Sequence, residues 1–157
     1  MVDIKIKYMR EDTPELFTND NGTGIDLSID YVYGVDSDFA DSFMRGEKIL
    51  IAKGTVLMFG LGVAMELPEG YFANVRPRSS MYKHFKAIQT NAVGLIDDSY
   101  NGDNDEWRVQ VLFMEHSVIQ RGDRMCQFTI EKAIPFNLNV VDSLGNKDRG
   151  GYGTSGK

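Results

Sequence analysis

Apolar and polar residues alternate in short segments along most of the chain, and turn-forming residues separate the segments. Alternation with a period of two places successive side chains on opposite faces of a β-strand. Segments of this kind predict strands over residues 2–8, 25–33, 48–52, 55–65, 71–76, 87–92, 107–114 and 125–131. Short strands separated by Gly, Pro, Asn and Asp are typical of a sandwich or barrel, so we expect an all-β fold.

The segment 25–33 shows the clearest alternation. Its apolar and aromatic set is Ile25, Leu27, Ile29, Tyr31 and Tyr33. One continuous strand would place Asp26, Ser28 and Asp30 together on the opposite, polar face.

Helical periodicity is scarce. The best candidate is a short helix over residues 79–85, with Ser79 or Ser80 as its N-cap. Residues 34–47 show no clear period, and we expect a loop or insertion there without a functional interpretation. Residues 144–157 are rich in Gly and small polar residues and cannot bury enough surface to stay ordered alone. The chain is therefore predicted to be one β domain, residues 1–143, followed by a flexible C-terminal arm, residues 144–157.

Length and composition limit the class of protein. A chain of 157 residues with 42% hydrophobic and 25% charged residues suits one hydrophobic core. No apolar run reaches the roughly 18 residues of a membrane span, and the N-terminus lacks a signal-peptide core. We therefore expect a cytoplasmic protein without membrane contact. The formal charge of −6 argues against a nucleic-acid binder, although a small anion can bind where basic residues gather.

The soft metal ligands are few. Cys126 is the single cysteine, which excludes an internal disulfide, and only His84 and His116 accompany it. This set is too small for a structural zinc site. Any bound metal is therefore expected to be a hard cation held by oxygen.

Several polar segments allow both an ordinary and a functional interpretation. RPRSS, residues 76–80, starts the predicted short helix and could be a cap with surface arginines or an anion site. GLIDDSYNG, residues 94–102, could be an exposed acidic hairpin, or a carboxylate base beside an aromatic ring that stacks on a sugar. Gln127 and Asp26 could each be a strand residue that faces solvent.

The glycine-rich tail matches two phosphate-binding patterns only in part. GYGTSG, residues 151–156, fits GxGxxG and, with Lys157, nearly fits a Walker A loop. Both patterns need a following helix, which the remaining sequence does not provide. The tail could instead be a solvated terminus, or it could wrap backbone NH groups, Arg149, Thr154 and Ser155 around phosphate oxygens.

Taken in order, five segments resemble the five motifs of the trimeric dUTPase family. They are GIDL (24–27), RPRSS (76–80), GLIDDSYNG (94–102), RGDRMCQF (121–128) and RGGYGTSG (149–156). The third and fifth are the most specific, and the resemblance spans about residues 24–156. The stretch YKHFKAIQTNAVGLID, residues 82–97, and the adjoining NDEW are most similar to Gram-positive bacterial and phage members.

The resemblance implies a jelly-roll-like, β-clip subunit in a homotrimer, with active sites built from more than one subunit. It implies hydrolysis of dUTP to dUMP and pyrophosphate by in-line attack of water on the α-phosphorus. By motif, Asp97 is the general base for that water. Mg²⁺ bridges the three phosphates, and Asp26 contacts the ion through water.

The same resemblance assigns the substrate contacts. Tyr100 packs against the deoxyribose and leaves no room for a 2′-hydroxyl. The hairpin 91–100, with Asn91, Gly94 and Ile96, reads the uracil edge. The phosphate contacts are Arg78, Ser79, Ser80 and Gln127, and Arg149, Thr154 and Ser155 of the arm bind the terminal phosphate. Gly153 of the arm is a further substrate contact. Tyr152 takes the place of the Phe that usually stacks over the base in the family.

Two alternatives remain open. A dCTP deaminase of related fold would act on the base and release ammonia, although Asp97, Tyr100 and the Arg149 arm suit hydrolysis better. A nucleotide-gated binding partner for a regulatory protein, as some phage relatives are, has residues 34–47 as its only support. Regulation and hydrolysis could also coexist in one protein.

Overall fold

The computed structural model describes residues 2–18 and 22–151. The fold is mostly β, as predicted, and each predicted strand segment contains at least one observed strand. The strands are β1 (Lys5–Tyr8), β2 (Phe17–Thr18), β3 (Ile25–Ser28), β4 (Tyr31–Tyr33), β5 (Ile49–Ile51), β6 (Val56–Gly60), β7 (Val63–Glu66), β8 (Tyr71–Pro77), β9 (Ala87–Gln89), β10 (Gly94–Asp97), β11 (Arg108–Phe113), β12 (Ser117–Ile119) and β13 (Arg124–Lys132), and the helices are α1 (Ser37–Met44) and α2 (Met81–Phe85).

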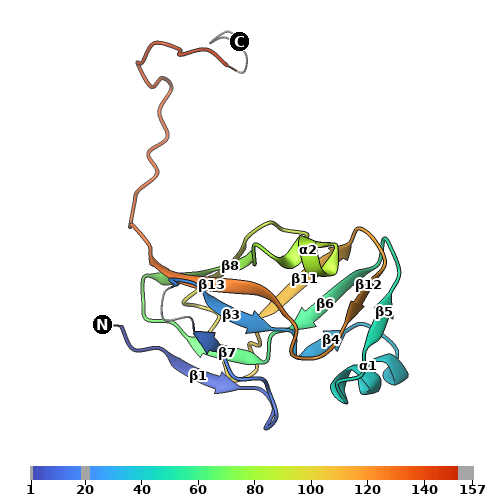
Figure 1. The fold of residues 1–157 in the computed structure, drawn as a ribbon. Coiled ribbons are helices and arrows are strands. Elements are labelled where there is room, and N and C mark those ends of the chain that lie inside the picture. The colour runs from blue at the N-terminus through green and yellow to red at the C-terminus, as the bar shows by residue number, and fades with distance from the viewer. Residues whose placement is uncertain (1, 19–21, 152–157) are drawn as a thin grey trace.

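Two larger antiparallel sheets form the body (Figure 1). One has the strand order β10-β8-β13-β3-β2, and the other has the order β4-β6-β11-β9. The pairs β1–β7 and β12–β5 form two small additional sheets. Within the described residues, no helix is long and apolar enough to cross a membrane.

Large aromatic side chains fill the core. Trp107, Phe43, Phe59 and Phe113 are fully buried. The Phe59 and Phe113 rings meet edge to face with centroids 6.5 Å apart, and Trp107 meets Phe128 in the same way at 5.2 Å. Aromatic pairs of this geometry stabilise a core beyond their buried area.

The prediction of one strand over 25–33 is wrong, because the chain changes sheet between β3 and β4. The apolar phase changes at the same point, since Val32 is buried while Tyr31 and Tyr33 are half-buried. Asp30 is fully buried, where its carboxylate is paired with Arg10 at 2.6 Å and with Arg121 at 2.8 Å. Segment 55–65 is likewise divided, into β6 and β7.

The prediction of a loop over 34–47 is also wrong. Helix α1 occupies Ser37–Met44, and the Asp36 side chain caps it by accepting a hydrogen bond from the Phe39 backbone NH at 2.8 Å. Phe43, one turn after Phe39, is fully buried. A capped helix that inserts one aromatic ring into the core is therefore stable even at eight residues.

The predicted short helix is confirmed as α2, with Ser80 at the N-cap position. The Ser80 side chain makes no capping hydrogen bond, so the expected capping contact is absent within the described structure. The helix ends at Lys86, which adopts a left-handed conformation with φ of 49°.

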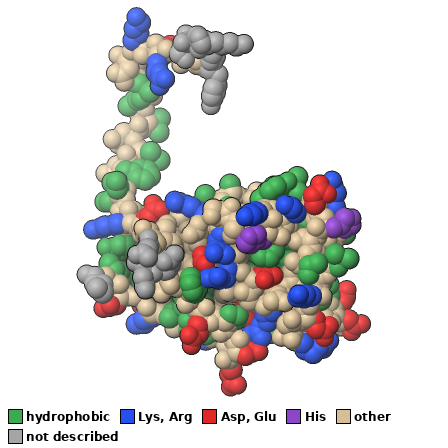
Figure 2. Space-filling model, viewed as in Figure 1, with side chains coloured by type: hydrophobic (Ala, Val, Ile, Leu, Met, Phe, Trp, Pro, Cys, Tyr) green, Lys and Arg blue, Asp and Glu red, His purple; other side chains and the backbone are tan. Residues whose placement is uncertain are grey.

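Beyond β13 the chain leaves the body as an extended segment through Gly151 (Figure 1). Hydrophobic side chains lie along it (Figure 2), and Ile134, Phe136, Leu138 and Val140 are all largely exposed. We call residues 133–151 the extended segment.

Candidate functional site

The first candidate pocket has a volume of 330 Å³ and gathers residues from three distant segments. Asp26 comes from β3, Arg124 and Gln127 come from β13, and Arg78 and Ser79 follow β8. Antiparallel pairing sets Gln127 opposite Asp26 and Cys126 opposite Pro77, which brings the three segments together. We call this the arginine pocket.

The carboxylate of Asp26 lies between two guanidinium groups. Its Oδ1 is 2.9 Å from Nε of Arg78, and its Oδ2 is 3.2 Å from Nη1 of Arg124. The Arg78 guanidinium also donates to the Arg124 carbonyl at 3.1 Å, and Arg124 lies over the Phe17 ring. Two cations and one anion leave a net positive charge, so the pocket is suited to an anionic ligand.

The turn after Arg78 presents two hydroxyl groups. Met81 donates its NH to the Arg78 carbonyl at 2.9 Å, which folds the chain through Ser79 and Ser80. Neither hydroxyl has a hydrogen-bond partner within residues 2–18 and 22–151. Both therefore remain available to bind oxygen atoms of a ligand.

Gly24 makes room for the amide of Gln127. A Cβ atom at Gly24 would lie 2.5 Å from Gln127 Oε1, closer than atoms can approach. A larger residue in place of the glycine that opens the GIDL segment would therefore displace the Gln127 amide from this position.

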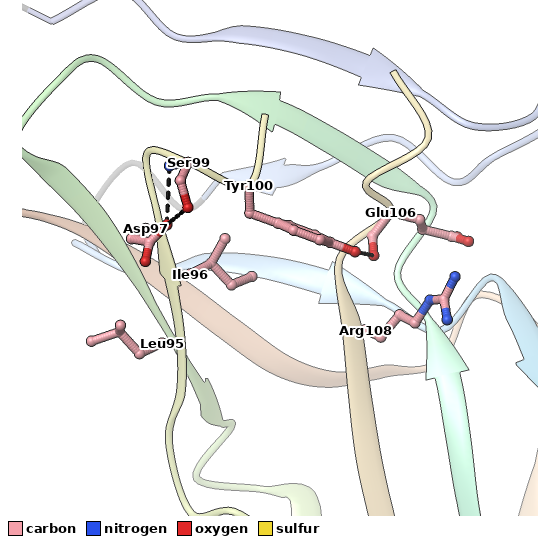
Figure 3. A pocket seen from close by; sticks show the side chains of 7 residues that line it. All are labelled: Leu95, Ile96, Asp97, Ser99, Tyr100, Glu106 and Arg108. Atoms are coloured by element: carbon pink, nitrogen blue, oxygen red, sulfur yellow. Dashed lines mark hydrogen bonds between the residues drawn. The ribbon is translucent and has the colours of Figure 1, made fainter. Parts of the chain in front are cut away.

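The second candidate pocket has a volume of 390 Å³ and lies at the end of β10 (Figure 3). Ile96, Asp97, Ser99 and Tyr100 line it from β10 and the following turn. Leu95 lines it from β10 as well, and Glu106 and Arg108 line it from the opposite side (Figure 3). We call this the tyrosine pocket.

Asp97 is an exposed, ionised carboxylate in this pocket. Its Oδ1 accepts hydrogen bonds from the Ser99 hydroxyl at 2.5 Å and from the Ser99 NH at 3.0 Å (Figure 3). These bonds hold the pKa of Asp97 below its usual value. Because both bonds involve Oδ1, Oδ2 is left to accept a proton from water.

The Tyr100 ring forms one wall of the pocket (Figure 3). Its hydroxyl donates to the backbone carbonyl of Glu106 at 3.2 Å. The ring is 38% exposed, so one face remains open to a ligand. A flat ring fixed at one end can define how much space a bound group has.

The hairpins expected over residues 94–102 and 91–100 are both wrong. Strand β10 pairs with β8, whereas β9 pairs with β11 in the other sheet. The turn between β9 and β10 is closed by Asn91, whose side-chain oxygen accepts from Gln89 Nε2 at 3.0 Å. Asn91 lies in this turn and Gly94 begins β10, and neither lines the tyrosine pocket, whereas Ile96 does.

The two pockets lie apart within one subunit. Asp97 stands opposite Phe72, which stands opposite Glu131, and Gln127 lies four residues from Glu131 along β13. Strand spacing and rise put Asp97 about 16 Å from Gln127. The structure thus brings together Asp26, Arg78, Ser79 and Gln127 in one pocket, and Ile96, Asp97 and Tyr100 in the other.

The remaining predicted residues belong to the arm. Arg149 lies on the extended segment and lines neither pocket. Tyr152, Gly153, Thr154 and Ser155 lie outside the described residues.

Sequence reasoning did not single out Arg124, Ser99, Glu106 and Arg108. The RGDRMCQF segment contains Arg124, three positions before Gln127, so a signal for it was present. Ser99 follows Asp97 by two positions, a spacing that favours a local side-chain hydrogen bond. Glu106 and Arg108 have no local signal, because their neighbours come from distant strands.

The protein groups fit a magnesium ion that is held mainly by its substrate. Among the residues described, no group of three or more His, Cys, Asp or Glu side chains is arranged to hold a metal ion. Both Asp26 oxygens are already paired with arginines. Mg²⁺ keeps its waters and prefers phosphate oxygens, so an ion that arrives with a polyphosphate suits this donor set.

The chain is similar throughout to proteins of one family. The family model described as dUTPase matches residues 44–156. A prophage-derived deoxyuridine 5′-triphosphate nucleotidohydrolase of Bacillus subtilis is 45% identical over 98% of this chain and 97% of its own. The enzyme of the same name from Escherichia phage T5 is 31% identical over 98% of each chain.

Solved structures show the same fold. A Staphylococcus bacteriophage 80alpha dUTPase variant with dUpNHpp has a TM-score of 0.74 and 14% identity, with 99% of each chain covered. The Streptococcus mutans dUTPase has a TM-score of 0.64 and 20% identity, with 85% of this chain and 98% of that chain covered. A phage phi11 dUTPase variant, with a TM-score of 0.70 and 14% identity over 90% and 98%, coordinates a structural Mg(II) ion.

Proposed function

Because the chain belongs to the dUTPase family and is a deoxyuridine 5′-triphosphate nucleotidohydrolase of the Gram-positive and phage type, we propose that its two pockets are complementary parts of one catalytic site. The observation that carries this proposal is that the two pockets offer different chemical groups, each of which the reaction needs. The arginine pocket offers cations and hydroxyl groups, and the tyrosine pocket offers a carboxylate base and an aromatic wall.

The triphosphate binds in the arginine pocket. Arg78 is held in place by Asp26 and by the Arg124 carbonyl, so its remaining donors are oriented toward the ligand. Ser79, Ser80 and Gln127 supply further hydrogen bonds to phosphate oxygens. Groups fixed before substrate arrives lose little entropy when they bind it.

Asp97 acts as the general base. Its Oδ2 orients a water molecule for in-line attack on the α-phosphorus and takes one of its protons, and pyrophosphate leaves from the opposite side. The low pKa of Asp97, set by Ser99, keeps the carboxylate ionised at neutral pH. The products are dUMP and pyrophosphate.

Tyr100 lies against the deoxyribose and excludes a 2′-hydroxyl, while Ile96 and the backbone around Asn91 and Gly94 recognise uracil. Stacking on an aromatic face requires the open side that Tyr100 has. Recognition of sugar and base thus belongs to β10 and its flanking turns.

Magnesium supplies charge neutralisation of the phosphates when it is bound. Asp26 is the residue that would contact it through water, because its oxygens face the arginine pocket at 12% side-chain exposure. In this arrangement Arg78 and Arg124 hold the Asp26 carboxylate in place.

The complete site requires a homotrimer. A separation of about 16 Å within a subunit prevents Asp97 from reaching a phosphate bound beside Gln127, so neighbouring subunits supply the two pockets. The extended segment supports the same arrangement, since its exposed apolar side chains need a partner surface. The arm residues Arg149, Tyr152, Gly153, Thr154 and Ser155 then close over the nucleotide and exclude water.

The test is pyrophosphate release from dUTP, UTP, dCTP and dTTP, each with magnesium and with a chelator. We expect magnesium-dependent turnover of dUTP alone, and Asp97→Asn should nearly abolish it because an amide cannot take the proton. Asp103→Asn, which removes an exposed carboxylate on the next turn, is the matched control and should keep full activity. Unchanged turnover in Asp97→Asn would end the proposal.

A regulatory partner is a second candidate function. Phage dUTPases such as that of bacteriophage 80alpha control the transfer of virulence genes by a G protein-like mechanism. In this chain, α1 exposes Asp38, Asp41 and Arg45 on the side away from buried Phe43. A partner that binds the exposed face of α1 should have a lower affinity for a double variant, Asp38→Lys with Asp41→Lys. The same variant should still hydrolyse dUTP.

A further inference from the structure

A buried charged cluster borders the tyrosine pocket, which Glu106 also lines. At its centre Glu106 is 1% exposed. Its carboxylate accepts hydrogen bonds from Arg10 at 2.9 and 3.3 Å, from the Gly62 NH at 2.9 Å and from the Tyr33 hydroxyl. A buried carboxylate with this many donors has a fixed position.

The neighbours of Glu106 are themselves fixed. Arg10 also donates to buried Asp30 at 2.6 Å and lies over the Tyr31 ring at 4.7 Å. Arg108, which lines the tyrosine pocket, lies over the Tyr33 ring at 3.9 Å. We call Arg10, Tyr33 and Glu106 the Glu106 cluster.

The backbone is shaped to admit this cluster. A Cβ atom on Gly60 would lie 2.5 Å from Glu106 Oε1 and 2.7 Å from its carboxyl carbon. Burial raises the pKa of Glu106, but the bonds from Arg10 and Tyr33 outweigh burial and lower it. Burial and then the bond to Glu106 raise the pKa of Tyr33. At neutral pH Glu106 is therefore the ionised acceptor and Tyr33 the donor.

The cluster is connected to the pocket wall by one bond. The Tyr100 hydroxyl donates to the Glu106 carbonyl, and no other hydrogen bond of the Tyr100 side chain occurs within the described chain. The turn between them is closed by Asp105, which bonds to Gly102 at 2.7 and 3.0 Å. The ring position therefore depends on where the Glu106 backbone is held.

We propose that the Glu106 cluster is a positioning device that holds the Tyr100 ring in place and thereby sets the preference for a 2′-deoxy sugar. A ring excludes a 2′-hydroxyl only if it cannot rotate away, and a displacement of about 1 Å is enough to change such a contact. Arg10 and Tyr33 do not line the tyrosine pocket, and in this proposal they act through Glu106 and Tyr100. The inference rests on the proposed contact between Tyr100 and the sugar.

The test measures kcat/KM for dUTP and for UTP and takes their ratio. Tyr100→Phe removes the bond to the Glu106 carbonyl but keeps the ring, and Tyr33→Phe removes one donor to the carboxylate. Each variant should lower the ratio by about fivefold, the usual effect of one hydrogen bond. Tyr82→Phe, on exposed α2, is the matched control and should leave the ratio unchanged.

The double variant separates positioning from general damage. If Tyr33 acts through Tyr100, then Tyr33→Phe should add nothing in a Tyr100→Phe background. Full additivity, or single variants with an unchanged ratio, would overturn the inference. Glu106→Gln, which keeps the carbonyl and the side-chain volume, should repeat the loss of selectivity if Tyr33→Phe does not fold.

Tyr100→Ala distinguishes failure of this inference from failure of the proposed function. It should lower the dUTP to UTP ratio more than any other variant, because it removes the wall itself. If it leaves the ratio unchanged, then the sugar contact assigned to Tyr100 is wrong. If it lowers the ratio and the cluster variants do not, then only the positioning role is wrong.

Discussion

Mixing two inactive variants should restore turnover of dUTP. Asp97→Asn removes the base from the tyrosine pocket, and Arg78→Gln removes a cation from the arginine pocket. Strand spacing and rise place Asp97 about 16 Å from Gln127 within a subunit, so we expect that one subunit does not use both pockets on one phosphate. A site between subunits can therefore combine two intact pockets from two different variants.

The size of the effect follows from random assembly. In an equimolar mixture that is unfolded together and refolded, each site takes its tyrosine pocket and its arginine pocket independently. About one quarter of the sites should then be intact, and the rate should recover to that fraction of the native rate. Pyrophosphate release measures the rate, and native mass spectrometry verifies that subunits have mixed.

A matched mixture gives the control. Asp97 and Tyr100 line the same pocket, so a mixture of Asp97→Asn with Tyr100→Ala should turn over dUTP no faster than its Tyr100→Ala subunits do alone. Background activity in the Asp97→Asn and Arg78→Gln mixture, despite mixed oligomers, would refute the geometric reasoning.

Three further predictions concern single features. Ser99→Ala should raise the pKa of Asp97 toward its usual value, so the acid limb of a kcat/KM against pH profile should move to higher pH. Gly60→Ala should lower the free energy of unfolding by roughly 1–3 kcal/mol in denaturant titration, because the new methyl group overlaps Glu106. Gly151→Ala, whose added Cβ meets no atom within 4 Å, should not. Removal of residues 144–157 should abolish turnover but leave the melting temperature nearly unchanged, since residues 144–151 are exposed.

The alternation of apolar and polar residues predicted a strand correctly wherever the whole alternating segment lies in one sheet. It failed at 25–33, because the break between β3 and β4 is stabilised by pairing of Asp30 with Arg10 and Arg121. Those partners are 20 and 91 positions away in the chain, so no window of neighbouring residues contains them. A buried carboxylate is indistinguishable from an exposed one until its partners are known.

The helix α1 was missed for a different reason. Its cap, Asp36, and the pair Phe39 and Phe43 were visible, but one helical turn of spacing is a weak signal in a segment this short. For the candidate site, ordered motifs indicated Asp26, Arg78, Asp97 and Gln127 together, but not their division between two pockets. That division depends on the register of β10, β8 and β13, which alternation alone does not fix.

The apolar side chains on the extended segment give the protein a dosage dependence. Covering Ile134, Phe136, Leu138 and Val140 contributes about 1.5 kcal/mol or more for each, and a lone newly synthesised subunit has no surface to cover them with. If each site is shared between subunits, as proposed above, such a subunit has only half-sites and leaves these apolar side chains exposed. At low expression, the rate of dUTP hydrolysis in a cell should therefore increase more steeply than the rate at which the subunit is synthesised.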